Sequence, residues 1–134
     1  MTKETISLCG KKVEMLYCAA AETGYEDLSG KSVEVFIPKQ AVGNDGSPIY
    51  DDNGKAVYNQ PTAMLGDYIK LGIAAIAAAY DREDSQSPID AKDIIYDANP
   101  QDITTLVTTV SRLRNSWYTM PASVTTEDAN GQKN

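Results

Sequence analysis

The sequence predicts an α+β protein, mostly helical, in which an N-terminal β-hairpin packs on a bundle of about four helices and a second hairpin is inserted as an arm. Apolar residues alternate around a glycine near the N-terminus, several segments carry apolar residues at helical spacing, and one internal segment is rich in turn residues. The 134 residues, 42% of them apolar, suit one globular domain. We expect that domain at 1–120, with the arm at 38–61 and a disordered polar tail at 121–134.

The first hairpin is expected over residues 4–17. Gly10 at the first position of a two-residue loop with Lys11 is typical of a type II′ turn, and the turn fixes which residues lie opposite each other. One face of the hairpin, directed toward the helices, is then apolar. The expected pairs on that face are Leu8 opposite Val13 and Ile6 opposite Met15, with Tyr17 continuing it.

The two cysteines are expected to be free thiols. The same register turns Cys9 to the other face, opposite Lys12, and leaves Cys18 beyond the strand, so the two sulfur atoms are not expected to meet. Two cysteines in a chain without a recognisable secretory signal are more often reduced than paired. We therefore expect a cytoplasmic protein.

A short helix is expected to follow the hairpin, over residues 18–29. Ala21, Tyr25 and Leu28 recur at helical intervals, and Gly30 suits a left-handed helix end. The apolar residues at 33–37 predict a brief extended stretch, which Pro38 should end.

The segment at 38–61 predicts the arm. Its composition shifts to Gly, Asn, Asp and Pro, and Asn53-Gly54 is flanked on both sides by apolar pairs. Asn-Gly is a strong hairpin-turn signal because both residues tolerate positive φ. We expect this second hairpin to project from the domain.

The segment from Thr62 to about Tyr80 predicts the central helix. Thr62 suits an N-cap, and residues 71–80 are apolar all round, which is typical of a buried helix. The small residues Gly72, Ala75 and Ala79 would let a neighbouring element approach closely. A run of ten apolar residues is too short to span a bilayer, which needs about 20, so no membrane partner is expected.

Two further helices are expected, each begun by a capping residue followed by proline. Ser87-Pro88 starts a short helix whose apolar side comprises Ile89, Ile94 and Ile95. Asn99-Pro100 starts a longer one. Its apolar stripe consists of Ile103, Leu106, Val110, Leu113 and Trp117.

The residues that most catalytic and metal sites require are missing. The chain has no histidine, which removes the commonest general base and metal ligand. Cys9 and Cys18 lack the spacing of a zinc finger or ribbon. Asp90, Asp93 and Asp97 can share one helix side, but solvated acids are commoner there than a catalytic set. We expect no enzyme, no cofactor and no bound metal.

Calcium and nucleic acid are also poor ligands for this chain. The segment at 51–54 superficially resembles a calcium loop, but aligning Gly54 with the loop glycine puts Ile49 and Gln60 at ligand positions. Nineteen acidic and twelve basic residues give a formal charge of -7, which repels a phosphate backbone, and the basic residues are scattered. Another protein is the partner that remains, and self-association is an open alternative.

The partner is expected to contact the ends of the apolar helices. The candidate residues are Tyr80, Leu113, Trp117 and Tyr118. A small domain need not bury every apolar helix face, and aromatic side chains are preferred anchors at protein interfaces. For Trp117, burial in the core is the competing interpretation, because it continues the apolar stripe; for Tyr118 the two interpretations are balanced.

The order of elements resembles that of tail assembly chaperones of long-tailed bacteriophages and related prophages. The resemblance rests on the hairpin Ile6-Ser7-Leu8-Cys9-Gly10-Lys11-Lys12-Val13, on Tyr17 entering a helix, on Tyr25-Glu26 and Ser29-Gly30-Lys31-Ser32, and on the helices that follow. It covers most of the chain outside 38–61 and the tail; the arm departs from the family pattern.

The resemblance implies a non-enzymatic factor in the bacterial cytoplasm that binds the tape-measure protein during tail morphogenesis and is absent from the finished virion. Two rival functions stay open: a structural virion component, such as a head-tail joining or tail protein, and a small enzyme with an unrecognised site. We expect the tail after Pro121 to contribute little to binding.

Overall fold

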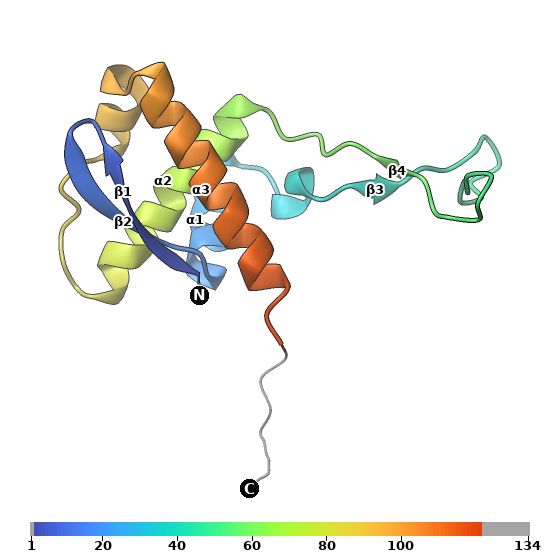
Figure 1. The fold of residues 1–134 in the computed structure, drawn as a ribbon, viewed down its shortest axis with the longest axis horizontal. Helices are drawn as coiled ribbons and strands as arrows, with labels where there is room; N and C mark the ends of the chain where they lie inside the picture. Colours follow the sequence, from blue (N-terminus) through green and yellow to red (C-terminus); the bar gives the residue numbers. More distant parts are fainter. Residues whose placement is uncertain (1, 122–134) are drawn as a thin grey trace, which may run out of the picture.

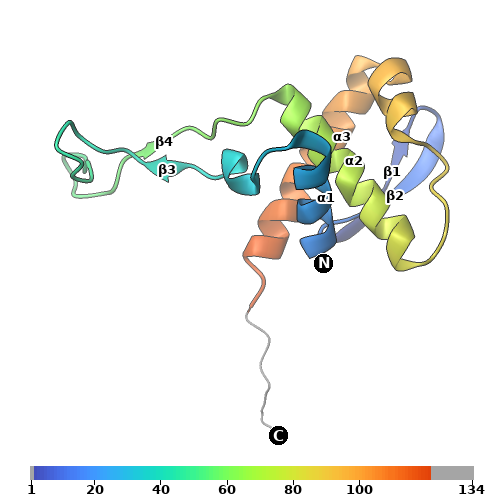
Figure 2. The same cartoon turned by 180° about the vertical axis from the view of Figure 1, so that it is seen from behind.

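The structure is a computed structural model that describes residues 2–121. It confirms the predicted fold class: the hairpin of β1 (Lys3–Leu8) and β2 (Lys11–Leu16) lies against the helices α1 (Ala19–Ser29), α2 (Leu65–Arg82) and α3 (Pro100–Tyr118) (Figure 1). The hairpin covers α2 and α3 on one side, and α1 packs on α2 from the other (Figure 2). No helix in this part of the chain is long and apolar enough to cross a membrane. Of the predicted tail at 121–134, residues 122–134 lie outside the described residues.

The hairpin has the predicted faces but a different register. Its loop is Cys9-Gly10, and both residues have positive φ, 52° and 77°, as a type I′ turn requires. Ile6 therefore pairs with Val13, and not with Met15 as predicted. The predicted pairing of Cys9 with Lys12 is likewise wrong, since Cys9 lies in the turn. A shift of two residues leaves every side chain on its predicted face.

The apolar face of the hairpin supplies a large part of the core. Five of its side chains are at most 8% exposed: Ile6, Leu8, Val13, Met15 and Tyr17. They pack against the buried face of α2, as predicted.

Helix α1 begins and ends where the sequence predicts. Gly30, at φ 71°, closes it by donating its backbone N–H to Glu26 O. The segment after it is not the predicted extended stretch but the 3-10 helix η1 (Val33–Phe36). The Ser32 hydroxyl accepts from the Glu34 amide and caps this turn, which directs Phe36 onto the ring of Tyr25 at 4.9 Å.

Helix α2 is the buried central helix, as predicted, but it begins at Leu65 and not at Thr62. Residues 62–63 remain extended because the Ala63 amide bonds to Val35 O and ties this strand-like segment to η1. The cap is supplied by Asp67, whose carboxylate accepts from the Met64 amide. Gly72 lies directly against Leu106 of α3, so the expected close approach of a neighbouring element is confirmed.

The short helix after α2 begins later than predicted. Ser87 forms a local turn with Ile89, and the helical segment starts after Asp90, which exchanges two hydrogen bonds with Asp93. This segment ends in the π-helix η2 (Asp93–Asp97). Ile94 is buried, but Ile95 is 56% exposed, contrary to the predicted apolar side, because adjacent residues cannot both face α2.

Helix α3 follows the prediction closely. The Asn99 side chain accepts from the Asp102 amide, and the Asp102 carboxylate accepts from the Asn99 amide, which forms a reciprocal cap ahead of Pro100. Of the predicted stripe, Leu106, Val110 and Leu113 are buried, and Ile103 and Trp117 are partly buried against the core.

The segment at 38–61 projects from the body as the predicted arm (Figures 1 and 2). Its stalk pairs β3 (Lys39–Gln40) with β4 (Tyr58–Asn59). Beyond the stalk the chain makes two tight turns, closed by Gly46 and Gly54, instead of one. Three backbone hydrogen bonds connect the segments around these two turns. The Ala41 amide donates to Val57 O, the Val57 amide to Ile49 O and the Ile49 amide to Ala41 O, which closes a ring.

Candidate functional site

Two of the four predicted partner-binding residues, Leu113 and Tyr80, make contacts within the chain itself. Leu113 is 3% exposed and therefore belongs to the core. The Tyr80 hydroxyl accepts a hydrogen bond from the Glu14 amide at 3.0 Å, so this side chain covers the outer edge of β2. Neither residue offers an open apolar surface.

The other two, Trp117 and Tyr118, fasten the end of α3 to the start of α1. The Trp117 ring lies 5.6 Å from that of Tyr17, and Tyr17 and Tyr118 both donate their hydroxyls to Glu22 Oε2, at 2.7 and 2.6 Å. Burial first, and then the Glu22 carboxylate, raises the pKa of both phenols. The four predicted residues thus lie in three separate places in the fold and do not form one continuous surface.

The most buried charged group is the Asp67 carboxylate, which is 4% exposed. It accepts from the Met64 amide at 2.9 Å, from the Tyr25 hydroxyl at 3.0 Å and from Lys31 Nζ at 3.1 Å. Burial alone would raise the pKa of this carboxyl, but the hydrogen bonds from Met64, Lys31 and Tyr25 outweigh it and lower the pKa. The fully bonded carboxylate connects α1 and the loop that follows it to the start of α2, which is a structural role.

We predict that Asp67→Ala lowers the free energy of unfolding at pH 7 by about 1–3 kcal/mol, because the Tyr25 hydroxyl and the Met64 amide lose their acceptor. The folded-state pKa is below that of an unfolded aspartate, about 3.9, so the stabilisation is present above that pH and is lost as pH falls through the folded value. Urea unfolding at pH 7 and pH 3 should show the difference between parent and variant shrinking in acid. A difference that grows in acid would contradict this role.

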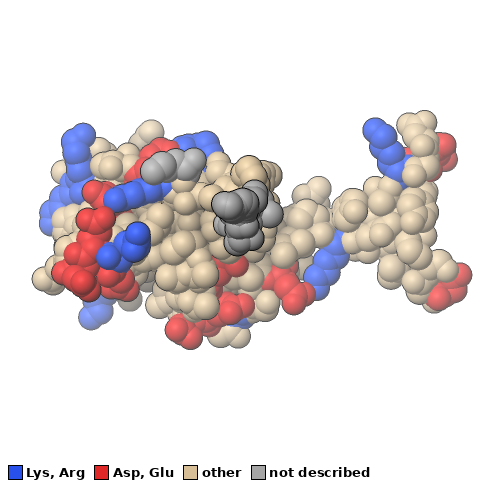
Figure 3. All heavy atoms as spheres, turned by 90° about the horizontal axis from the view of Figure 1, so that it is seen from below, with Lys and Arg blue, Asp and Glu red and all other residues tan. Residues whose placement is uncertain are grey.

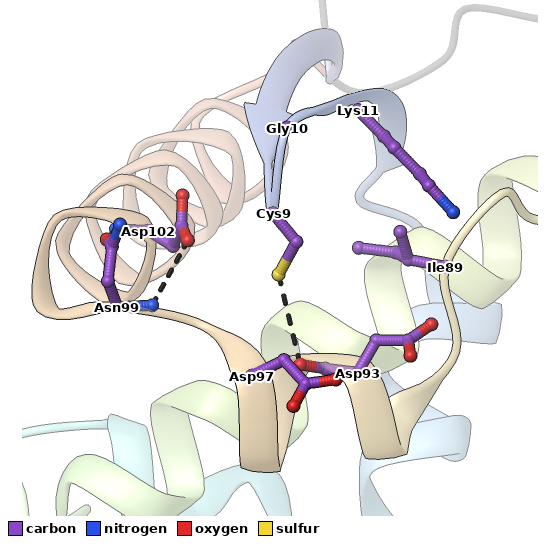
Figure 4. A pocket seen from close by; sticks show the side chains of 8 residues that line it. All are labelled: Cys9, Gly10, Lys11, Ile89, Asp93, Asp97, Asn99 and Asp102. Carbon is purple, nitrogen blue, oxygen red and sulfur yellow. Dashed lines mark hydrogen bonds between the residues drawn. The ribbon is translucent and has the colours of Figure 1, made fainter.

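A polar cavity of about 470 Å³ lies under the tip of the first hairpin (Figure 4). Cys9 points into it from the turn, and its thiol lies 3.8 Å from the backbone oxygen of Asp93. The carboxylates of Asp93 and Asp97 come from η2, and that of Asp102 comes from the first turn of α3. The cavity therefore has a negative wall contributed by two separate elements.

The chemistry of this cavity does not suit a nucleophile or a metal. Burial first, and then the carboxylates of Asp102, Asp93 and Asp97, raises the pKa of the Cys9 thiol. A thiol kept protonated at neutral pH is a poor nucleophile. Within residues 2–121 no group of three His, Cys, Asp or Glu side chains is placed to hold a metal ion.

Four of the twelve large apolar side chains that are exposed in the described part of the chain lie on the arm. The residues of this apolar arm surface are Val42, Ile49, Tyr50 and Tyr58, which are between 39% and 59% exposed. Figure 3 shows the middle of the arm almost free of charged side chains, whereas acidic and basic residues alternate over the body. The sequence carried a signal for this surface, because the apolar pairs that flank Asn53-Gly54 have no helix nearby to cover them.

A scan against protein-family models finds no matching family, and searches of curated proteins and of solved structures find no match either.

Proposed function

We propose that the protein is a non-enzymatic binding factor that acts as a phage tail assembly chaperone and binds the tape-measure protein during tail morphogenesis. The apolar arm surface carries the proposal, since four exposed apolar side chains lie on a segment that contributes nothing to the core cluster of the body. Exposed apolar clusters of this kind mark interaction sites in soluble proteins. The resemblance supplies the class of partner.

The arm is suited to contact a partner because the body does not need it for its own core. The buried cluster of the body includes side chains from the hairpin, α1, η1, α2 and α3, but none from 38–61. A lone hairpin is only marginally stable in water. Contact with a partner surface would therefore stabilise the arm, which three backbone hydrogen bonds hold together. The arm thus adds a binding element to a self-sufficient domain.

The charge of the chain fits the same role. Its formal net charge of -7 favours solubility and disfavours self-association. A chaperone for an elongated apolar partner needs one surface that binds apolar side chains and another that keeps the complex in solution. In this proposal the apolar arm surface binds the partner, and the charged body keeps the complex in solution.

A structural virion component is the second candidate, and the projecting arm is the observation that favours it. An extended arm with apolar side chains can insert into a neighbouring subunit and connect copies into a ring. Purified particles separate the two functions: a chaperone is absent from them, whereas a structural component is present at a fixed copy number.

We predict that co-expression with the longest helical protein encoded beside this chain increases that protein's soluble fraction severalfold, and that the two proteins co-purify. The apolar arm surface would cover the partner's exposed helix faces, which otherwise aggregate. The measurement is the soluble fraction with and without this chain. A folded sample that gives neither a gain in solubility nor co-purification would contradict the chaperone function and leave the structural component ahead.

A further inference from the structure

The two edges of the first hairpin differ in how their backbone groups are satisfied. The Tyr17 amide donates to Thr2 O, so in an antiparallel ladder the amides of Thr5 and Ser7 point outward on β1. On β2 the amides of Lys12 and Glu14 do the same. On β2 the Glu14 amide is bonded to the Tyr80 hydroxyl. On β1 the amides of Thr5 and Ser7 have no hydrogen-bond partner among residues 2–121. The edge of β1 is therefore open to another strand.

A groove of about 600 Å³ runs along this open edge, between β1 and α3. Glu4 and Ser7 line it from the strand, and threonines of α3, including Thr105 and Thr108, line it from the helix. A strand edge beside a helix is the arrangement in which proteins bind an extended peptide by strand addition. The Glu4–Arg112 ion pair lies at one end of the groove.

The other end of the groove is acidic. Asp102 lines both this groove and the cavity under the hairpin tip, so the two hollows are neighbours. The cavity adds the carboxylates of Asp93 and Asp97, and the amino group of Lys11 is bonded to Pro88 O. A lysine or arginine side chain that entered the cavity from a bound strand would find carboxylates of Asp93, Asp97 and Asp102 in its lining.

We propose that the groove between β1 and α3 binds an extended segment of a partner protein as a third strand on β1, with a lysine or arginine of that segment in the acidic cavity. A partner with a basic residue fits better than a second copy, because this chain carries a net charge of -7 and its arm strands are only two residues long. The inference rests on the protein-binding function proposed above. It adds a second partner contact, on the body, to the one proposed for the arm.

The test uses the full chain and a synthetic peptide, acetylated and amidated, of the sequence Lys-Thr-Val-Thr-Val-Thr-Lys. In NMR titrations we expect saturable shifts of the Thr5 and Ser7 amides and at least about tenfold slower hydrogen exchange at both. A matched peptide with glutamate in place of lysine should bind at least about fivefold more weakly, and added salt should reduce that difference. Because no co-expressed partner is involved, this test can fail while the chaperone function holds, and the reverse.

A charge reversal at the acidic end provides the specificity control. Asp97→Lys, at an exposed residue with no side-chain hydrogen bond within the described part of the chain, should remove the preference for the lysine peptide. Glu34→Lys makes the same change on η1, away from the groove, and should leave the preference intact. Equal binding of both peptides, or unchanged Thr5 and Ser7 amides at saturation, would overturn the proposal. Concentration-dependent shifts of these amides without peptide would also overturn it, in favour of a second copy in the groove.

Discussion

Ile76→Asp is expected to abolish the cooperative unfolding transition of the protein. Ile76 is 3% exposed and lies within the core cluster between α2, the hairpin and η2. A carboxylate there would be buried without a partner, at a cost of at least about 4 kcal/mol, which is comparable with the whole stability of a domain of this size. Thermal unfolding followed by circular dichroism is the measurement.

The adjacent residue gives a matched control. Ala77→Asp introduces the same charge one position along α2, where the side chain is exposed. It should cost less than about 1 kcal/mol, mainly through lower helix propensity. If the Ile76 variant melts within a few degrees of the Ala77 variant, then α2 is not the central helix of the core.

Gly72→Ala is expected to destabilise the protein by about 1–3 kcal/mol and to lower its Tm by roughly 3–10 °C. A Cβ atom at Gly72 would lie 2.7 Å from Cγ and Cδ1 of Leu106, which is fully buried on α3. Contact this close forces either the leucine out of its rotamer or the two helices apart. The clash outweighs the usual gain from replacing a helical glycine by alanine.

Gly66→Ala tests the same substitution in the first turn of the same helix, where a Cβ atom would meet nothing within 4 Å. This variant should be more stable than the parent by up to about 1 kcal/mol, because alanine has the higher helix propensity. Opposite signs at the two positions are the expected result. A stabilising Gly72→Ala would mean that α2 and α3 do not approach closely at this point.

The sequence predicted features that depend on periodicity. The faces of the hairpin, the buried α2 and the stripe of α3 each repeat an apolar pattern over many residues, so an error at one position does not change the result. The hairpin register was wrong for the same reason. Shifting it by two residues preserves the alternation, and the sequence gives no measure of the positive φ that Cys9 adopts in the turn.

Features that depend on contacts between distant residues were not predictable. The ends of α2 and η1 are set by the hydrogen bond from the Ala63 amide to Val35 O, which only the folded chain brings together. For Tyr118, burial and partner binding were balanced interpretations, and its hydroxyl is bonded to Glu22, 96 residues away in the sequence. Sequence spacing gives no information about a contact of this kind.

The arm was predicted, but its exposed apolar side chains were not among the predicted partner-binding residues. Asn53-Gly54 gave one turn, whereas Asp45-Gly46 marks a second turn that joins it through residues 41, 49 and 57. The expectation that helix faces bind the partner did not anticipate how completely the hairpin and α1 cover α2. With those faces buried, the exposed apolar side chains of the arm became the candidate contact.

The most direct test of the account compares two surface variants in the co-expression assay. The arm variant carries Val42→Ser, Ile49→Ser, Tyr50→Ser and Tyr58→Ser, and the body variant carries Leu28→Ser, Ile95→Ser and Tyr96→Ser, all at exposed apolar positions. Both should keep a Tm within a few degrees of the parent, because neither set belongs to the core cluster. We predict that the arm variant no longer keeps the partner soluble while the body variant does. If the arm variant keeps the partner as soluble as the parent does, while the body variant does not, partner binding does not belong to the arm.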